Sequence, residues 1–342
     1  MPSRPSIRPI ESDLVEVLRG ATAQRTLTDQ IAERARRDGV TRVVFVGVGG
    51  SWASSVPATT LMASKGAPFS AENINATEFT DLYLDGIGEK TLVIASSHSG
   101  GTPETVMAAR AAADRGALVV SVSSATGNPL ADAAEFNLVY GSERTITSAK
   151  YVLLTELSYS LFEAYGVEAE TLLARGALDA VPEATLGALL AVDDQLGAIA
   201  ERYAKSDNLY VLASGPLTGL AYMLSVCYLV EQQWMKSTHF FAADFFHGPF
   251  ELAQDDQPYI VLCGQDASRP QTDRVVTFLR RYHDEFAQID VAAMPLGGIL
   301  DDARQYVGHI PMATVVARLA DHFEAVTGHD LDTRIYMHRA QY

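Results

Sequence analysis

The sequence predicts an α/β protein made of two tandem units, each a parallel sheet of about five strands covered by helices on both faces. Three observations support this fold class. Short runs of β-branched and apolar residues alternate with helical segments, as they do in parallel sheets. Several strands end directly in loops of glycine and serine. The same pattern restarts near the middle of the chain, which indicates a duplicated unit.

The first unit begins with a helical segment at residues 12–37, which is acidic at its start and basic at its end, as the helix dipole prefers. Strands are predicted after it at residues 42–46, 69–73, 91–96, 117–122 and 136–139. One helix follows the glycines at 47–50 and reaches Leu61, and another runs from Pro103 to Gly116. A helix over residues 148–165 closes the unit.

The second unit repeats the order of the first. The tetrad Ile-Ala-Glu-Arg stands at residues 31–34 and at 199–202, each time at the same distance ahead of a glycine that follows a strand. Strands are predicted at residues 209–213, 239–243, 259–263 and 289–292, with a helix at 273–286. The expected division is therefore a first domain at 12–170, a second at 186–332 and a C-terminal tail at 333–342. The connection between the two domains carries no readable motif.

The composition favours a cytoplasmic globular protein. A formal net charge of −16 repels the phosphates of nucleic acids and of anionic membranes, so neither partner is expected. The longest apolar stretch, near residues 217–230, is too short to span a bilayer, and the N-terminus lacks an apolar signal core. Cys227 and Cys263 lie in apolar runs and are expected to be reduced core residues.

Neither a cofactor nor a metal is expected. The first glycine loop has no Gly-Lys-Ser/Thr and lacks the third glycine of a dinucleotide fingerprint. His322 and His329 have no companion cysteines, and no HExxH motif is present. Taken alone, four other histidines are interpreted as surface or satisfied core residues: His98, His283, His309 and His338. A serine hydrolase is not supported, because the G-x-S-x-G elbow is absent.

Two loops of the first unit follow strand ends and precede helices, where open α/β sheets bind ligands. Their candidate binding residues are Gly49, Gly50 and Ser51 in the first loop and Ser97, His98, Ser99 and Thr102 in the second. Hydroxyls and backbone N–H groups at a helix N-terminus can hold a phosphate without lysine or arginine. Serine and threonine also cap helices, so the residues alone leave both explanations open.

A candidate acid–base pair lies in the second unit. An apolar helical stripe at Leu217, Leu220, Leu224 and Cys227 continues to Glu231. A carboxylate on a core-facing stripe is rare unless it is paired, because desolvation disfavours its charged form. His247 follows among Phe240, Phe241, Phe245, Phe246 and Phe250. A carboxylate and an imidazole can shuttle protons, but a structural glutamate and a turn-capping histidine explain the pattern equally well.

Together these motifs resemble the sugar isomerase (SIS) domain enzymes that act on phosphosugars. The G-G-S loop, the S-H-S-G-G-T-P-E loop and the F-F-H-G-P-F-E segment are similar to those of the fructose-amino-acid 6-phosphate deglycases. The resemblance spans nearly the whole chain as two tandem SIS domains, like the isomerase half of glucosamine-6-phosphate synthase. Synthase-type isomerases carry a catalytic lysine near the C-terminus, and this chain has no lysine after Lys236. That departure suits a deglycase, whose substrate already carries an amine.

The resemblance implies a role for each candidate residue. Ser51, Ser97, Ser99 and Thr102 correspond to phosphate-binding positions. Glu231 corresponds to the residue that moves a proton between C1 and C2, and His247 to the one that assists ring opening. Ser148 and Lys150 fall where the synthase has a substrate-facing A-S-T-K segment. In the family, the histidine comes from the neighbouring subunit, so a homodimer with shared active sites is expected.

The implied reaction is the hydrolysis of a fructosamine 6-phosphate to glucose 6-phosphate and an amine by a reverse Amadori proton transfer. Two other functions stay open: an aldose–ketose phosphosugar isomerase and a non-catalytic phosphosugar sensor. The sequence does not identify the amine. It also leaves open whether Lys150, Arg334 or Tyr342 contacts the substrate.

Overall fold

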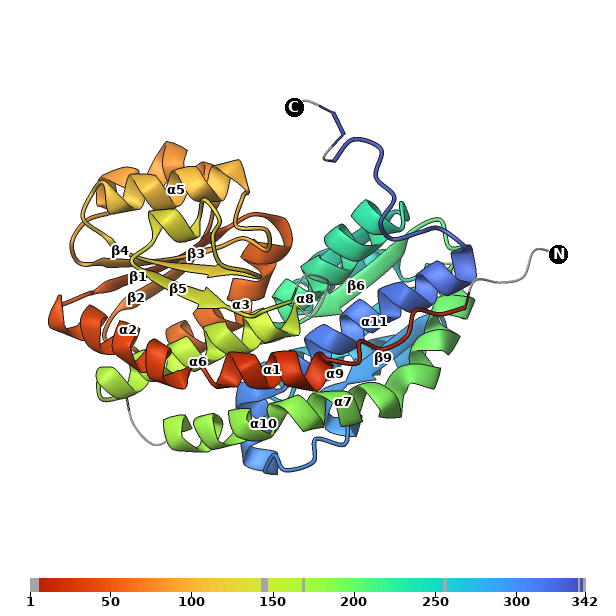
Figure 1. Cartoon of the computed structure of the whole chain (residues 1–342). Helices are drawn as coiled ribbons and strands as arrows, with labels where there is room; N and C mark the ends of the chain where they lie inside the picture. The colour runs from red at the N-terminus through yellow and green to blue at the C-terminus, as the bar shows by residue number, and fades with distance from the viewer. Residues whose placement is uncertain (1–5, 143–146, 168–169, 255–256, 338, 341–342) are drawn as a thin grey trace.

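The computed structural model describes residues 6–142, 147–167, 170–254, 257–337 and 339–340 of the chain. Two parallel sheets lie in separate halves of the molecule, with helices between them (Figure 1). The strand order is β2-β1-β3-β4-β5 in the first sheet and β7-β6-β8-β9 in the second. The first four strands of each unit follow the same order, as a duplication predicts.

The strands have these bounds: β1 (Arg42–Gly47), β2 (Ser70–Asn75), β3 (Thr91–Ser96), β4 (Leu118–Ser123), β5 (Phe136–Val139), β6 (Leu209–Ala213), β7 (Ser237–Phe241), β8 (Tyr259–Cys263) and β9 (Phe286–Asp290). The central strand β1 is buried from Val43 to Gly47, as an all-parallel sheet requires. The predicted α/β class is confirmed, although the second sheet has four strands rather than about five.

The α-helices have these bounds: α1 (Leu14–Thr22), α2 (Arg25–Arg37), α3 (Gly49–Ser64), α4 (Ala76–Glu78), α5 (Pro103–Ala113), α6 (Ser148–Ala164), α7 (Glu170–Tyr203), α8 (Thr218–Tyr222), α9 (Arg269–Tyr282), α10 (Asp301–Val307) and α11 (His309–Thr327). A wider π-helical stretch, η5 (Met223–Gln232), continues α8. Within the described ranges, no helix is both long and apolar enough to cross a membrane.

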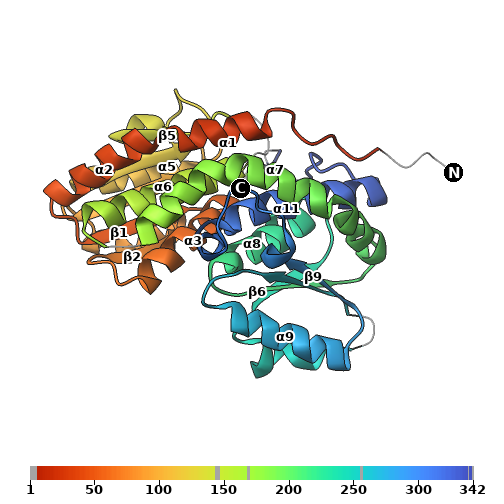
Figure 2. The same ribbon diagram turned by 90° about the horizontal axis from the view of Figure 1, so that it is seen from below.

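One apolar core joins the two units. It contains Phe45 of β1, Leu154 of α6, Leu178 of α7, Val211 of β6 and Leu319 of α11. Two smaller cores lie on the outer faces of the sheets, one under α5 and one under α9. Figure 1 shows α5 on the opposite face of the first sheet from α2 and α6, and Figure 2 shows α9 on the opposite face of the second sheet from α8 and α11. Helices from both units therefore form a shared central layer.

The segment predicted as one helix at residues 12–37 is divided into α1 and α2 at Ala23 and Gln24. Gln24 provides a reason for the break. Its side-chain amide donates to the carbonyl of Val139 and accepts from the Val139 N–H at 3.2 Å. The break thus satisfies the exposed backbone of the edge strand β5.

Other boundaries also differ from the prediction. Strands β7 and β9 begin at Ser237 and Phe286, two and three residues earlier than expected. The connection without a readable motif belongs to α7, because Ala174, Leu178 and Val181 recur at helical steps and are buried. The helix predicted to reach residue 286 ends at Tyr282. His283 adopts an extended backbone, and its ring nitrogen bonds to the carbonyl of residue 257 at 2.8 Å, which turns the chain into β9.

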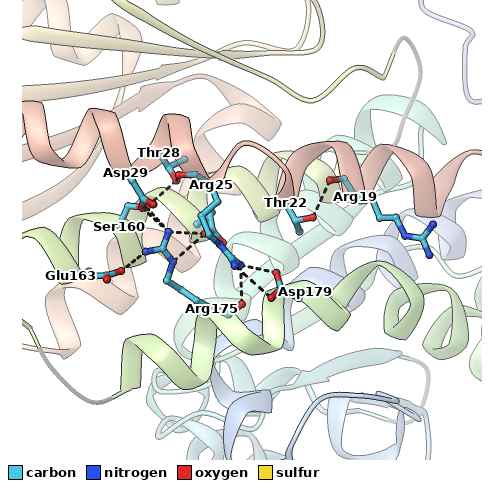
Figure 3. Close-up of polar contacts among 10 residues, drawn as sticks. Arg19, Thr22, Arg25, Thr28, Asp29, Ser160, Glu163, Arg175 and Asp179 are labelled. Atoms are coloured by element: carbon cyan, nitrogen blue, oxygen red, sulfur yellow. Dashed lines mark hydrogen bonds and ion pairs between the residues drawn. The ribbon is translucent and has the colours of Figure 1, made fainter.

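Charged side chains join α2, α6 and α7 (Figure 3). Glu156 of α6 is 0% exposed and accepts hydrogen bonds from Nε of Arg25 at 2.6 Å and from Nε of Arg175 at 3.2 Å. Arg175 also pairs with Asp29 at 2.6 Å, and Arg25 pairs with Asp179 at 2.8 Å. This cluster ties the first unit to the long helix that leads to the second.

Candidate active site

The first glycine loop lies where β1 meets α3, against the second unit. Val48 is the N-cap of α3, and Gly49 has a positive φ of 52°, a conformation that favours glycine. A Cβ at Gly50 would lie 3.2 Å from the Sδ of Met223 in η5. The absence of a side chain at Gly50 therefore lets the start of α3 approach η5 closely. Ser51 follows in the first turn of α3.

In the second loop, the hydroxyl groups of Ser97, Ser99 and Thr102 form hydrogen bonds within the loop itself. The Oγ of Ser97 lies 2.8 Å from the Oγ1 of Thr102 and accepts a hydrogen bond from the Gly100 N–H at 3.1 Å. Gly100 has a φ of 65°, and a Cβ there would lie 2.0 Å from the side chain of Asn128, so only glycine fits. The Ser99 hydroxyl accepts a hydrogen bond from the Gly101 N–H at 3.1 Å.

Thr102 is the N-cap of α5 and Pro103 is its first residue, as the sequence predicts. The Thr102 side chain makes no hydrogen bond to the amides of the first helical turn, because its hydroxyl faces Ser97 instead. Within the described loop, the first N–H groups of α5 therefore remain available to an anion, which the helix dipole also favours.

Lys150 lies between the two loops. It is 3% exposed, and its Nζ donates to the Oγ of Ser51 at 3.0 Å and lies 5.7 Å from the centre of the Tyr140 ring. The hydroxyl of Tyr140 in turn lies 2.7 Å from Nδ1 of His98 in the second loop. Burial lowers the pKa of Lys150 to about 8. An anion bound between the loops would be close to this buried ammonium group.

Glu231 lies at the end of η5, one residue before its last residue Gln232. Burial raises the pKa of the Cys227 thiol, one helical turn before Glu231, to about 12. The Glu231 carboxylate raises that pKa further and the Lys150 ammonium opposes it, so Glu231 and Lys150 each lie within electrostatic range of the Cys227 thiol. Glu231 accepts a hydrogen bond from Nη2 of Arg334 at 3.0 Å.

The expectation that Glu231 lies on the buried stripe is only partly met. Leu217, Leu220 and Leu224 are buried, but the Glu231 side chain is 29% exposed. The π-helical stretch ends one residue later at Gln232, so the carboxylate lies at the rim of the core. Arg334 from the C-terminal tail provides the partner that such a carboxylate needs.

His247 lies in a different environment. It is exposed, in a short turn at Phe245–His247 that is followed by Gly248 at a φ of 141°. Among the described residues, no hydrogen bond, ion pair or ring contact joins His247 to Glu231. The structure therefore does not bring the predicted acid–base pair together within one chain.

The phenylalanines around His247 pack mainly inside the second unit. Phe245 is 0% exposed, and the centres of the Phe245, Phe246 and Phe250 rings lie within 6 Å of the Phe278 ring on α9, at 5.7, 5.6 and 5.9 Å respectively. Phe241 is 50% exposed. Most of this aromatic cluster therefore forms core under the second sheet, and only Phe241 presents much apolar surface.

The remaining candidates have separate places. Ser148 is 2% exposed and lines a cavity of about 300 Å³ together with Tyr228 and Gln232 of η5. His338 and Tyr342 lie outside the described residues. Two further residues contact the candidates: Lys150 donates a hydrogen bond to Ser51, and Arg334 donates one to Glu231. Local sequence patterns do not predict either contact. The one available signal for Lys150 is a lysine among the apolar residues of a helix.

Two parallel sheets with glycine- and serine-rich loops at their strand ends match a known family. The sequence profile of the SIS domain matches residues 39–166, which include the whole first sheet. The chain belongs to the SIS domain family, and the resemblance predicted from its motifs is confirmed.

Two curated relatives and one solved structure illustrate the similarity within this family. Fructosamine deglycase FrlB of Bacillus subtilis is 31% identical over 305 residues, which cover 89% of this chain and 93% of FrlB. Fructoselysine 6-phosphate deglycase of Escherichia coli K12 is 27% identical over 78% of each chain. The crystal structure of a Bacillus subtilis protein proposed to be a phosphosugar isomerase superposes with a TM-score of 0.87 at 30% identity, covering 94% of this chain and 99% of that one.

Proposed function

We propose that the chain is a deglycase that hydrolyses a fructosamine 6-phosphate to glucose 6-phosphate and a free amine. The observation that carries the proposal is the surroundings of Cys227, which lies within electrostatic range of both the Glu231 carboxylate and the Lys150 ammonium group, while Lys150 donates to Ser51 at 3.0 Å. The relatives FrlB and fructoselysine 6-phosphate deglycase are deglycases by name, and their similarity extends over most of the chain.

In this proposal, the two hydroxyl-rich loops bind the phosphate. The hydroxyls of Ser51, Ser97, Ser99 and Thr102 and the free N–H groups of α5 supply hydrogen-bond donors for an anion. Lys150 supplies a buried positive charge beside Ser51. Binding the phosphate at one end of the substrate fixes the position of C1 and C2 at the other.

The first chemical step is proton removal from the open-chain substrate. The Glu231 carboxylate takes a proton from C1, and the electrons of the C–H bond form a double bond between C1 and C2. The C2 carbonyl oxygen takes up a proton, for which His247 is our candidate donor, and the product is an enaminol. General acid–base catalysis supplies roughly 10²–10⁴-fold, so positioning through the phosphate must supply much of the remaining acceleration.

The second step reverses the proton transfer at the neighbouring carbon. Protonated Glu231 returns its proton to C2, and the nitrogen lone pair forms a double bond to C1. Water then adds to C1, and the resulting carbinolamine expels the amine, which takes up a proton. The sugar is left as the aldehyde of glucose 6-phosphate. All bonds and protons balance with water as the only co-reactant.

The proposal includes a homodimer in the cytoplasm. His247 is exposed and has no described contact with Glu231 of its own chain. A two-fold arrangement in which His247 of one subunit reaches Glu231 of the other would complete the site. Val230, Trp234 and Phe241 are 43%, 46% and 50% exposed, and such apolar side chains are common in interfaces.

The test is incubation of the protein with several 6-phosphofructosyl amino acids, followed by measurement of glucose 6-phosphate and of the free amine. The proposal predicts equal amounts of both products and no reaction with unphosphorylated adducts. Interconversion of aldose and ketose phosphates without amine release would instead identify an isomerase. Binding without turnover would identify a sensor, and either result would contradict the deglycase.

A further inference from the structure

Arg334 is the only residue of the described C-terminal tail that forms an ion pair with the proposed base. Its Nη2 lies 3.0 Å from Oε1 of Glu231, and the two side chains are 18% and 29% exposed. Nη1 of Arg334 donates to the backbone carbonyls of Leu331 and Thr333, the latter at 3.1 Å. The tail therefore fixes the guanidinium group at the rim of the site. Within the described residues, the Nε–H of Arg334 has no acceptor.

The chemistry of the proposed reaction determines which part of the substrate approaches Arg334. Glu231 must reach C1, and C1 carries the nitrogen of the amine. A group in contact with the Glu231 carboxylate therefore lies close to the substituents on that nitrogen. If the amine is an α-amino acid linked through its α-nitrogen, its carboxylate is separated from the nitrogen by a single carbon atom. The planar guanidinium fork binds carboxylates with two parallel hydrogen bonds.

We infer that Arg334 recognises the α-carboxylate of an amino acid joined to the sugar through its α-nitrogen, and that this contact draws Arg334 away from Glu231. The inference rests on the proposed deglycase function and names its substrate class. While Arg334 donates to Oε1 of Glu231, that carboxylate oxygen is engaged by the guanidinium group. A substrate carboxylate that engages Arg334 would leave Glu231 free to accept the C1 proton.

The other charges nearby make Arg334 the cation best placed for this role. Asp330 and Asp332 lie on the same tail, and both accept hydrogen bonds from Arg8 at 3.1 Å. Lys150 is buried and contacts Ser51, beside which we propose that the phosphate binds. An α-linked substrate therefore has a positive group for each of its two anionic ends.

The experiment compares three 6-phosphofructosyl adducts that differ at the amine. The alanine adduct carries an α-carboxylate, the ethylamine adduct lacks it, and the lysine adduct linked through its ε-nitrogen carries it far from the sugar. Each is assayed for glucose 6-phosphate release with wild type, Arg334→Met and Arg334→Lys. Arg339→Met is the matched control, because Arg339 is an exposed arginine on the same tail.

We expect wild type to prefer the alanine adduct over the ethylamine adduct in kcat/KM. Arg334→Met should lose roughly ten- to a hundredfold on the alanine adduct, the range expected for a charged hydrogen bond, and far less on the other two. Arg334→Lys should recover part of the preference, and Arg339→Met should retain all of it.

Equal losses of Arg334→Met on all three adducts would overturn the inference, because Arg334 would then act only by holding Glu231. A wild-type enzyme that releases glucose 6-phosphate from the alanine and ethylamine adducts equally well would also overturn it while leaving the deglycase function intact. If wild type releases glucose 6-phosphate from none of the three adducts, both the proposed function and this inference are wrong.

Discussion

The ammonium group of Lys150 lies 3.0 Å from the hydroxyl of Ser51, although the two residues are 99 positions apart in the chain. Lys150 lies in the first turn of α6, and Ser51 lies in the first turn of α3, directly after the first strand. The lysine is 3% exposed. Its buried charge therefore lowers the stability of the ligand-free fold, and an anion bound nearby would stabilise that charge.

The first prediction is that Lys150→Met stabilises the fold near neutral pH. Burial lowers the pKa of Lys150 from 10.5 to about 8. Between pH 8 and pH 10.5 the lysine is mostly deprotonated in the folded chain but still protonated in the unfolded chain. The unfolded chain therefore binds more protons, and the stability of wild type rises with pH across this range. Below pH 8 the buried charge costs on the order of 3 kcal/mol, which the substitution removes.

Urea unfolding at pH 7 and pH 10 measures this difference. Lys150→Met should be more stable than wild type at pH 7, and the gap should shrink towards pH 10. Other titrations cancel in the comparison between the two proteins. Lys90→Met is the control, because Lys90 is exposed and should give no such trend. A gap that is the same at both pH values would show that the buried charge is not its cause.

The second prediction concerns the hydroxyl pair of the second loop. Ser97→Ala and Thr102→Ala should each weaken the binding of glucose 6-phosphate by about 1–3 kcal/mol, because each removes a hydroxyl that we propose as a donor to the phosphate. Glucose should bind poorly to wild type and to both variants. Titration calorimetry measures these affinities, and Ser64→Ala, an exposed serine on α3, is the matched control. Equal affinity of wild type for glucose and glucose 6-phosphate would contradict a phosphate site.

The third prediction is that the carboxylate of Glu156 is required for stability. Glu156→Gln leaves Arg25 and Arg175 without their shared buried carboxylate, which should destabilise the fold by roughly 3–5 kcal/mol. Asp179→Asn removes a partner of Arg25 that is 62% exposed, and should cost less than about 1 kcal/mol. Similar losses of unfolding free energy in both variants would show that burial of the pair is not decisive.

The fourth prediction tests the shared active site. Glu231→Ala and His247→Ala should each be inactive as homodimers. A heterodimer of the two variants should recover about half of the wild-type activity, because two-fold symmetry restores one complete site of two. Differently tagged chains, co-expressed and purified through both tags, provide the heterodimer. If it stays as inactive as its parents, both residues act within one chain.

The sequence predicts the elements around the site better than it predicts the contacts within it. Strand β3 and the capping pair Thr102 and Pro103 depend on local patterns, and their prediction is confirmed. The contact between Arg334 and Glu231 joins residues 103 positions apart, and no local period reports it. Such tertiary contacts depend on how α11 and the tail pack against η5.

Periodicity also fails where a helix changes its geometry. The apolar stripe of the second unit predicts a buried Glu231, but the helix widens at Met223 and ends at Gln232. The break at Gln24 is likewise invisible to helical periodicity, because it depends on the backbone of Val139 in a distant edge strand. At Gln24 a contact across the fold overrides the local helical preference, whereas in η5 the change of helical geometry itself shifts the stripe.

The most direct test of the account is the activity of Glu231→Gln on a 6-phosphofructosyl amino acid that wild type hydrolyses. Glutamine keeps the shape and a hydrogen-bonding group of the side chain but cannot accept the C1 proton. The account predicts that this variant binds the adduct with nearly wild-type affinity, unfolds at nearly the wild-type temperature and releases less than about one hundredth as much glucose 6-phosphate per unit time. If the variant keeps a tenth or more of the wild-type kcat, then Glu231 is not the base and the proposed mechanism is wrong.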